Sequence, residues 1–378
     1  MIIIIGTGLA GYSTAKEFRK HDKESPLMLI TSDDGANYSK PMLSNALTKD
    51  KSPESLAMQS AEKMAETLNA TIKTETQVTA INPAQHSVTA GGETYEYSKL
   101  VLATGANPIT PPLEGDATDD IYTVNSLHHY RSFHPVVGDT ETIAIIGPGL
   151  IGCEFANDLA NIGKTVHVVG PDKTPLSLLL PETAGQALQA DLEKQGITFH
   201  LGVLPKAVNK KGNGYELTLD NGDTIEADTV LSAVGLRPNT ELAEMADLHV
   251  ERGVIANRLL QTSDPDIYTL GDSAQVEGRV LPYIMPIMHA ARALGQTLAG
   301  TDTEVKYPAM PVVIKTPAHP IVISAPAPGA EGEWDIEQRE DGVKALFKNG
   351  DDLLGFALTG SAVSEKQALS KELPPVMG

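Results

Sequence analysis

The stretch Ile2-Ile3-Ile4-Ile5-Gly6-Thr7-Gly8-Leu9-Ala10-Gly11 runs from four consecutive isoleucines into the pattern G-x-G-x-x-G. A helical pattern through Ala15 and Phe18 follows it, and a second apolar run covers residues 27–31. In such a pattern the first glycine allows a tight turn, the second lets the backbone approach a pyrophosphate, and the third packs the helix against the strand. The stretch therefore predicts a β-α-β unit that binds a nucleotide at the N-terminus of its helix.

The same arrangement occurs a second time in Thr142-Ile143-Ala144-Ile145-Ile146-Gly147-Pro148-Gly149-Leu150-Ile151-Gly152. A helical pattern continues to Ile162, Gly163 ends it, and an apolar strand is expected at residues 165–169. One G-x-G-x-x-G is a weak indication, because glycines are common in ordinary turns. Two copies that each follow a strand and open a helix favour two dinucleotide sites in one chain.

Length and composition narrow the classes of protein that fit. The 378 residues suit two or three domains, and a hydrophobic content of 41% is enough for sizeable cores. The net charge of −20 argues against nucleic acid and anionic membranes as partners, and no apolar run has the length of a membrane span. No export signal is visible, and the one cysteine, Cys153, can form no internal disulfide, which fits the cytoplasm. Cysteine-rich metal sites are excluded, and no metal site is predicted.

Other strands are predicted to end in glycine turns, as parallel strands do where they face a ligand crevice. They cover residues 100–103, 229–233 and 267–270. Polar alternation at 88–97 and 215–225 predicts antiparallel hairpins. After Pro311, alternation at 312–324 and 343–358 predicts a small mixed sheet.

Asp272 connects the last of these strands with cofactor chemistry. The strand ends in Leu270-Gly271-Asp272, and a carboxylate there can accept a hydrogen bond from a ribityl hydroxyl. The alternative is that Asp272 caps the helix that follows, and the two roles are compatible. The neighbouring turn Ala103-Thr104-Gly105 would let the backbone pass close to the same cofactor.

Taken in order, these motifs resemble the pyridine nucleotide–disulfide reductase superfamily, and they span nearly the whole chain. The resemblance implies an α/β fold with two Rossmann-like dinucleotide-binding domains, one for FAD and one for NAD, and a small α+β C-terminal domain. Residues 1–110 and 242–310 would then form the FAD-binding domain, 111–241 the NAD-binding domain and 311–378 the C-terminal domain.

The redox cysteines that many members of this superfamily carry are absent. The loop expected next to the flavin, residues 38–46, contains no cysteine, and Cys153 falls in the second predicted helix, where we interpret it as a packing residue. A thiolate relay needs a thiol, so the chain resembles the thiol-free branch that passes electrons from flavin to small iron proteins. Within that branch it is similar to the rubredoxin reductases of alkane-hydroxylase systems, which share Tyr-Ser-Lys-Pro-Met-Leu-Ser at 38–44 and Ser-Ala-Val-Gly-Leu-Arg-Pro at 232–238.

The resemblance implies cofactor-binding residues around both glycine motifs and around the flavin. For FAD they are Gly6, Thr7, Gly8, Leu9, Ala10, Gly11, Thr31, Ser32, Asp33, Lys40, Pro41, Val78, Ala103, Thr104, Gly105, Gly271, Asp272, Ile284 and Lys315. For the nicotinamide nucleotide they are Gly147, Gly149, Leu150, Ile151, Gly152, Glu154 and Gly235. Val78 would contact the adenine through its backbone, and Ile284 would present its backbone to the pyrimidine edge of the flavin.

The same resemblance gives two residues a catalytic role. Lys315 would lie near the flavin N5 and O4, where its ammonium would stabilise negative charge on the reduced flavin. Glu154 would stand beside the nicotinamide and hold a contact to Lys315. The alternative for this pair is a buried salt bridge without a catalytic role. Lys40 would reach the phosphates or the flavin edge, or alternatively be a solvated surface lysine.

Two positions depart from the superfamily pattern, in which an acidic residue ends the second strand of each unit and binds a ribose. Thr31 and Gly170 stand there instead. The pair Ser32-Asp33 is a candidate for the FAD ribose. In the second unit Asp172 is the nearest acid and Lys173 the one nearby cation, a set that favours NADH over NADPH.

The implied reaction carries hydride from NADH to FAD and then single electrons to rubredoxin, an acidic iron protein, for an alkane hydroxylase or a similar system. Because this chain is also acidic, docking would need a local basic patch, for which Lys40, Lys49 and Lys51 are candidates. The alternatives are a ferredoxin reductase or another NADH-dependent flavin electron-transfer enzyme, and a flavin-binding redox sensor or scaffold without efficient turnover.

Overall fold

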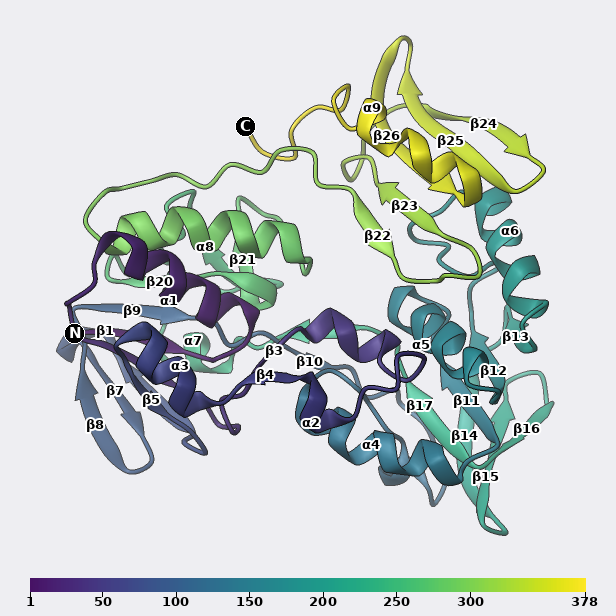
Figure 1. The fold of residues 1–378 in the computed structure, drawn as a ribbon, viewed down its shortest axis with the longest axis horizontal. Coiled ribbons are helices and arrows are strands. Elements are labelled where there is room, and N and C mark those ends of the chain that lie inside the picture. Colours follow the sequence, from purple (N-terminus) through teal and green to yellow (C-terminus); the bar gives the residue numbers. More distant parts are fainter.

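The computed structural model describes residues 1–378, and its first unit is built on a five-stranded parallel sheet (Figure 1). In sheet order the strands are β20 (Ile267–Thr269), β9 (Lys99–Leu102), β1 (Ile2–Ile5), β2 (Leu27–Ile30) and β5 (Thr71–Lys73). The four isoleucines of β1 are all buried because other elements cover both faces of the sheet.

Successive isoleucines of β1 belong to different cores, since side chains alternate across a strand. Ile2 and Ile4 lie in a core with three helices, α1 (Leu9–His21), α3 (Ala61–Leu68) and α8 (Ile284–Leu298). Ile3 and Ile5 lie in a core with the antiparallel strands β6 (Val78–Asn82), β7 (Ser87–Ala90) and β8 (Glu93–Glu96), and with α7 (Glu241–Met245). The hairpin predicted at 88–97 corresponds to β7 and β8.

The second unit repeats this plan with a four-stranded parallel sheet. In sheet order its strands are β13 (Ile197–Leu201), β12 (Thr165–Gly170), β11 (Thr142–Ile146) and β17 (Thr229–Ser232). One face is covered by α4 (Leu127–Asp139), α5 (Leu150–Asn161) and α6 (Glu182–Glu193). The other face is covered by the antiparallel strands β14 (Pro205–Lys211), β15 (Gly214–Leu219) and β16 (Thr224–Ala227), which include the hairpin predicted at 215–225.

The C-terminal segment forms one sheet with the strand order β22 (Val312–Ile314), β23 (Ile321–Ser324), β26 (Asp352–Thr359), β25 (Gly342–Asn349) and β24 (Glu333–Arg339). All of its pairings are antiparallel, so the prediction of a mixed sheet was wrong. Short connections impose this for β22–β23, β24–β25 and β25–β26, because parallel neighbours need a long crossover. One face of the sheet packs on the helices of the second unit in one shared core, and the other face packs on the C-terminal segment around Ala362 and Leu369.

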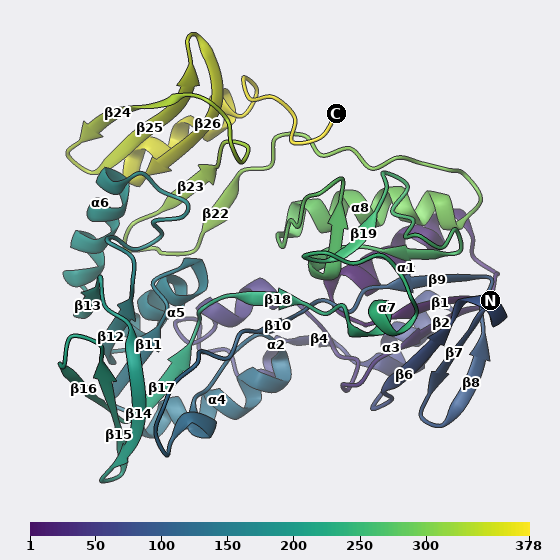
Figure 2. The ribbon, with the colours of Figure 1, turned by 180° about the vertical axis from the view of Figure 1, so that it is seen from behind.

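The first and second units are connected in two ways: by a pair of strands and by a segment of the first unit that reaches the second. The antiparallel strands β10 (Ala106–Pro108) and β18 (Leu236–Pro238) run side by side between the two halves (Figure 2). The second segment contains β3 (Asn37–Tyr38), η1 (Lys40–Asn45), α2 (Pro53–Leu56) and β4 (Ala57–Gln59). Leu43, Leu47 and Leu56 of this segment are buried in the core of α4 and α5, so a loop of the first unit is anchored on the second.

The chain end returns to the first unit. Met377 is buried in the core of α1 and α8, and its backbone exchanges hydrogen bonds of 2.8 and 2.9 Å with Tyr307. The predicted C-terminal domain of residues 311–378 therefore sends its last residues back across the molecule. The remaining short elements are β19 (Val254–Ala256), β21 (Ala274–Val276), η2 (Pro83–Gln85), η3 (Thr118–Asp120), η4 (Gly271–Ser273), η5 (Gly360–Glu365) and α9 (Lys366–Leu369). None of the helices combines the length and the apolar character needed to cross a membrane.

Candidate functional site: two nucleotide cradles joined at a buried ion pair

In the first glycine motif, the first and last glycines have no room for a side chain, whereas the middle glycine does. Gly6 has φ +108°, and a Cβ there would overlap the carbonyl oxygen of Ala103 at the end of the neighbouring strand β9. A Cβ at Gly11 would overlap the carbonyl oxygen of Gly6. By contrast, an added Cβ at Gly8 would have no atom within 4 Å. The protein's own packing thus requires Gly6 and Gly11, whereas Gly8 faces free space.

The second motif repeats this geometry. Gly147 has φ +111°, and its Cβ would lie 2.6 Å from the carbonyl oxygen of Ala233, while one at Gly152 would overlap Gly147. Gly149 again has no neighbour within 4 Å. Helices α1 and α5 begin directly after the open glycines, and no side chain caps either helix. Free N–H groups at a helix N-terminus favour an anion such as a pyrophosphate.

Asp33 lies just beyond β2, beside the first glycine motif. Its Oδ1 accepts hydrogen bonds from the Thr31 hydroxyl (2.7 Å), the Gly35 N–H (2.9 Å) and the Thr7 hydroxyl (3.4 Å). Its Oδ2 makes no hydrogen bond within the protein. Asp33 therefore keeps one carboxylate oxygen free for a ribose diol, and Thr31 orients it. The predicted companion Ser32 is exposed.

Val78, the residue predicted to contact the adenine, opens strand β6. Its side chain is buried in the core beneath the first sheet. Its carbonyl oxygen accepts a hydrogen bond of 3.3 Å from the side-chain amide of Gln77. Only the backbone of Val78 is thus available to a ligand.

Asp272 and Lys40 meet at the other end of the cradle. The Nζ of Lys40 lies 3.4 Å from the Oδ2 of Asp272, although 232 residues separate them in sequence. A Cβ at Gly271 would lie 2.9 Å from the Cβ of Ala10, so Asp272 is held against α1. Asp272 caps no helix, because η4 has no side-chain cap and α8 begins after Tyr283. The capping alternative is therefore wrong.

Three further segments contain residues predicted to bind FAD. In the turn after β9, the Thr104 hydroxyl donates to the carbonyl of Asn239 (3.0 Å), and the Asn239 amide donates to the carbonyl of Thr104 (2.8 Å). Pro41 stands in the first turn of η1, where its fixed φ suits the start of a helix. Ile284, which opens α8, is exposed, and no side chain caps that helix.

Glu154 occupies the junction between the units. It lies in the first turns of α5, its residue is 1% exposed, and it accepts hydrogen bonds from the Ser44 hydroxyl (2.5 Å) and the Lys315 N–H (2.8 Å). Its Oε2 also forms an ion pair with the Nζ of Lys315, whose side chain remains 25% exposed. The predicted pair is thus in contact, and the side chain of Lys315 remains accessible to solvent or to a ligand.

The sequence reasoning missed three residues around this pair: Ser44, Asn157 and Asp158. Asn157 accepts a hydrogen bond from the Ala318 N–H (3.2 Å), and Asp158 accepts hydrogen bonds from the loop after Ser44. The available signal was the spacing of Glu154, Asn157 and Asp158, which places three polar side chains on one face of an otherwise apolar helix.

A packing contact explains the missing acidic residue of the second unit. A Cβ at Gly170 would overlap the ring of Pro148, the residue after the first glycine of the second motif. A larger residue at 170 would therefore force the Pro148 ring or the neighbouring backbone to shift. Asp172 is half-buried and accepts a hydrogen bond from the Ser177 hydroxyl, and Lys173 is exposed.

The other predicted residues of the second cradle surround its mouth. Leu150 is half-buried and Ile151 is 41% exposed, both in the first turn of α5. Gly235 has φ +116°, and its carbonyl accepts a hydrogen bond of 3.0 Å from the Ile109 N–H. These residues leave an apolar rim next to the free N–H groups of α5.

Cys153 plays no part in the chemistry of this junction. It is fully buried, and its thiol lies 3.4 Å from the carbonyl oxygen of Pro148. Burial raises the pKa of the Cys153 thiol well above its ordinary value, and the neighbouring Glu154 raises it further. The thiol therefore stays protonated, in agreement with its interpretation as a packing residue.

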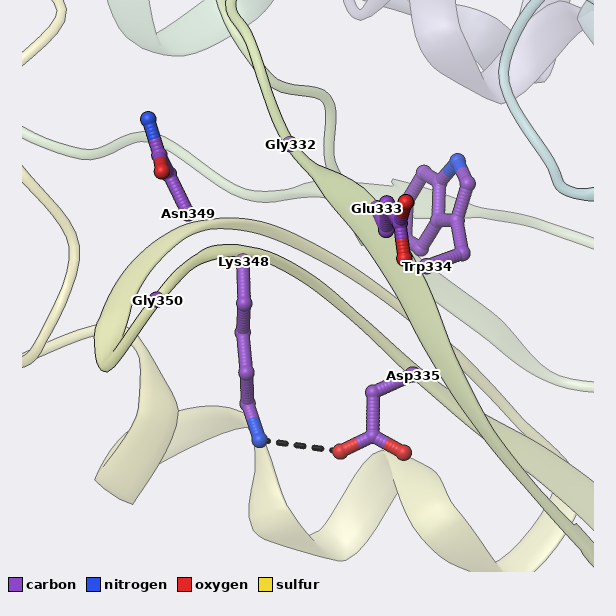
Figure 3. A pocket seen from close by; sticks show the side chains of 7 residues that line it. All are labelled: Gly332, Glu333, Trp334, Asp335, Lys348, Asn349 and Gly350. Atoms are coloured by element: carbon purple, nitrogen blue, oxygen red, sulfur yellow. Dashed lines mark hydrogen bonds and ion pairs between the residues drawn. The ribbon is translucent and has the colours of Figure 1, made fainter.

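A hollow of about 530 Å³ lies far from both motifs, at the end of the β24–β25 hairpin (Figure 3). Lys348 and Asp335 point toward each other there and form an ion pair of 2.9 Å, while Trp334 points away (Figure 3). The rest of the lining consists of Gly332, Gly350, Glu333 and Asn349. Nothing in this hollow indicates catalysis.

Comparison with known proteins places this geometry in a family. Residues 1–297 match the family model described as pyridine nucleotide-disulphide oxidoreductase. Residues 304–373 match the model described as rubredoxin binding C-terminal domain. The chain therefore belongs to the pyridine nucleotide-disulphide oxidoreductase family. The predicted superfamily and the predicted α/β fold with a separate C-terminal domain are confirmed.

Individual relatives are similar over the whole chain. A rubredoxin-NAD(+) reductase of Alcanivorax borkumensis is 50% identical over 378 residues, which cover 100% of this chain and 99% of the relative. One of Acinetobacter baylyi is 46% identical, with 99% and 98% covered. The putidaredoxin reductase in a covalent complex with putidaredoxin shares the fold at 23% identity and a TM-score of 0.89, with 99% and 93% covered.

Members of this family bind FAD and NAD(H), and the residues present fit both groups. Each cradle offers an open glycine at the start of an uncapped helix. The first cradle adds a carboxylate with a free oxygen at one end and the Lys40–Asp272 pair at the other. The two cofactors of the prediction are thus accommodated by separate parts of the chain.

We predict that Gly8→Ala weakens FAD binding without unfolding the chain. The added methyl group meets no protein atom, but it occupies the space of a pyrophosphate, so we expect at least about a tenfold loss of FAD affinity. The control Gly11→Ala should destabilise the cofactor-free chain by about 1–3 kcal/mol, because its methyl group overlaps Gly6. Flavin fluorescence titration and thermal unfolding measure both effects. Unchanged FAD affinity in Gly8→Ala would place the cofactor elsewhere.

We also predict that positions 148 and 170 are coupled. Gly170→Asp alone should cost about 1–3 kcal/mol, because its Cβ overlaps the Pro148 ring. The double variant Pro148→Gly/Gly170→Asp should recover most of this loss, and it should bind NAD(+) more tightly relative to NADP(+). Thermal unfolding and nucleotide titration of the four proteins complete the cycle. Additive effects of the two substitutions would contradict the steric explanation.

Proposed function

We propose that the chain is an FAD-dependent NADH:rubredoxin oxidoreductase that supplies electrons to an alkane hydroxylase or a similar system. The observation that carries this proposal is the match of residues 304–373 to a rubredoxin binding domain, on a chain 50% identical from end to end to a rubredoxin-NAD(+) reductase. The family membership of residues 1–297 supports the FAD and NADH sites.

When bound, FAD accepts a hydride from NADH and returns the two electrons one at a time. The protein's task is to hold both nucleotides with their reactive rings together and to stabilise the charge that results. We assign the first cradle, from Gly6 to Asp272, to FAD and the second, from Gly147 to Gly235, to NADH. The free N–H groups of α1 and α5 would bind the pyrophosphates, and the Asp33 carboxylate the FAD ribose.

In this proposal Lys315 and Glu154 are the catalytic residues. The partly exposed ammonium of Lys315 would stabilise negative charge on the reduced flavin. The buried carboxylate of Glu154 fixes this ammonium, because the ion pair and the backbone N–H of Lys315 both bind it. Lys40, paired with Asp272, would play a similar part at the phosphate or flavin edge.

The second cradle favours NADH over NADPH. A 2′-phosphate needs cations, and the loop after β12 offers Lys173 alone beside the carboxylate of Asp172. NADH carries a ribose diol instead, for which Asp172 is the available acceptor. Its hydrogen bond from Ser177 would hold the carboxylate in place.

For the docking of rubredoxin we propose the basic loop around η1. Lys49 and Lys51 are exposed and follow Lys40 in the same segment, so this loop gathers three cations on an otherwise acidic chain. An acidic partner would be steered there. We propose the cytoplasm as the compartment, which suits the reduced and buried Cys153.

Rapid mixing of the FAD-loaded chain tests the proposal. NADH should bleach the flavin faster than NADPH does, and the reduced protein should then reduce rubredoxin faster than it reduces a 2Fe–2S ferredoxin. Equal rates with both acceptors would keep the cofactors but overturn the named partner. A chain that NADH leaves oxidised would be the sensor or scaffold of the alternative hypothesis.

We predict that Lys315→Met slows flavin reduction by about tenfold to a hundredfold, because an ammonium next to the developing charge is lost. Lys315→Met also leaves the buried Glu154 carboxylate without its cation. The double variant Glu154→Gln/Lys315→Met removes that carboxylate, so it separates the loss of the ammonium from the effect of an unpaired buried charge. Lys348→Met is a matched control, because it breaks the ion pair with Asp335 at the distant hairpin. Stopped-flow rates for Lys315→Met equal to those of the control would remove the proposed role.

A further inference from the structure

Helix α5 carries three polar side chains that point out of the second unit. Glu154, Asn157 and Asp158 are 1%, 0% and 3% exposed. Each of them binds a segment that comes from another part of the chain. The two carboxylates are one helical turn apart, so they face the same direction. Only Glu154 has a cation beside it.

Asp158 is a buried carboxylate that is satisfied by backbone alone. Its Oδ2 accepts a hydrogen bond from the Leu47 N–H and its Oδ1 one from the Thr48 N–H, both at 3.0 Å. The Thr48 hydroxyl adds a hydrogen bond of 3.3 Å to the carbonyl oxygen of Asp158. A buried charge without a cation is costly unless its hydrogen bonds are complete. The contact is therefore specific for this carboxylate and this loop.

The loop that Asp158 holds is the one that borders both cofactor cradles. Its first residue, Lys40, pairs with Asp272 of the first unit. Its middle, Ser44, donates to Glu154 of the second unit. Asp158 binds the far end of the same loop at Leu47 and Thr48. The loop is thus held at three points, and two of them are carboxylates of α5.

We propose that Asp158 is a positioning residue that sets the spacing between the two cofactor sites. It touches neither cradle, but it fixes a first-unit loop on the helix whose N-terminus is assigned to NADH. This inference rests on the proposed function. Hydride transfer needs the reacting atoms at about 3–3.5 Å, and a displacement of about 1 Å can cost about a hundredfold in rate. Loss of the anchor should therefore slow this step specifically.

Asp228 provides a matched control. Its Oδ2 accepts hydrogen bonds from two successive backbone groups, the Glu141 N–H (2.9 Å) and the Thr142 N–H (2.8 Å). These groups lie at the amino end of β11, within the second unit and at the opposite end of the sheet from the glycine motif. Asp228 is exposed, so Asp228→Ala removes a similar pair of carboxylate–backbone hydrogen bonds from the surface of the second unit without releasing the η1 loop.

The experiment compares Asp158→Ala, Asp158→Asn and Asp228→Ala as FAD-loaded proteins. In stopped flow at saturating NADH we expect Asp158→Ala to reduce the flavin about tenfold to a hundredfold more slowly. The apparent Kd for NADH should stay within about twofold, and reoxidation by ferricyanide should be unchanged. Asp158→Asn keeps one acceptor oxygen, so its rate of flavin reduction should lie between those of Asp158→Ala and the unmodified chain. This variant preserves the test if the alanine variant does not fold.

Hydrogen exchange gives a second readout that does not depend on turnover. Amides of residues 44–51 should lose protection in Asp158→Ala and keep it in Asp228→Ala. Lost protection with an unchanged reduction rate would overturn the positioning role, and so would equal slowing in Asp158→Ala and Asp228→Ala. If NADH fails to reduce the unmodified chain, the proposed function fails, and this inference fails with it. Hydrogen exchange would still show whether Asp158 holds the loop of residues 44–51.

Discussion

The carboxylate of Glu154 is buried at the place where three parts of the chain meet. It comes from the second unit, accepts a hydrogen bond from Ser44 of the first unit, and binds both the backbone and the ammonium of Lys315 at the end of β22. A charge in such surroundings is tolerated only when its partners are all in place. Glu154 therefore links the two units and the C-terminal sheet at one point, and the proposed chemistry is located there.

The two nucleotide cradles follow from a simpler constraint, which is the close approach of backbones. In both motifs the outer glycines are fixed by neighbouring carbonyl oxygens, and the middle glycine is left open. The duplication of this geometry gives two uncapped helix N-termini, each after an open glycine, on two sheets. The loop around η1 and the turn after β22 both bind Glu154, and Asn157 and Asp158 add further hydrogen bonds from α5 to other parts of the chain.

Much of this was predictable from sequence, because short-range patterns determine it. Four buried isoleucines before G-x-G-x-x-G specify a parallel strand, a turn and a helix, and the contact of Lys315 with Glu154 was expected from the family resemblance. The prediction of a mixed C-terminal sheet was wrong, because alternation indicates which side chains are buried but not the direction in which the neighbouring strand runs. Strand β24 was missed since most of its residues are exposed and polar.

Other features depend on contacts between distant residues and have no local signal. The capping alternative for Asp272 was wrong because the next α-helix begins only after Tyr283, and the contact of Asp272 with Lys40, 232 residues away, has no local signal. Gly170 departs from the family pattern because of Pro148, which only the folded structure brings against it. The anchoring by Asp158 likewise requires the η1 loop to cross from one unit to the other.

The most direct test of the central claim is a crystal structure of the FAD-loaded chain with NAD(+) bound. We expect the flavin ring in contact with Lys315, the nicotinamide against this ring, and the two pyrophosphates over Gly8 and Gly149. A flavin bound without contact to Lys315, or both nucleotides in one cradle, would contradict it.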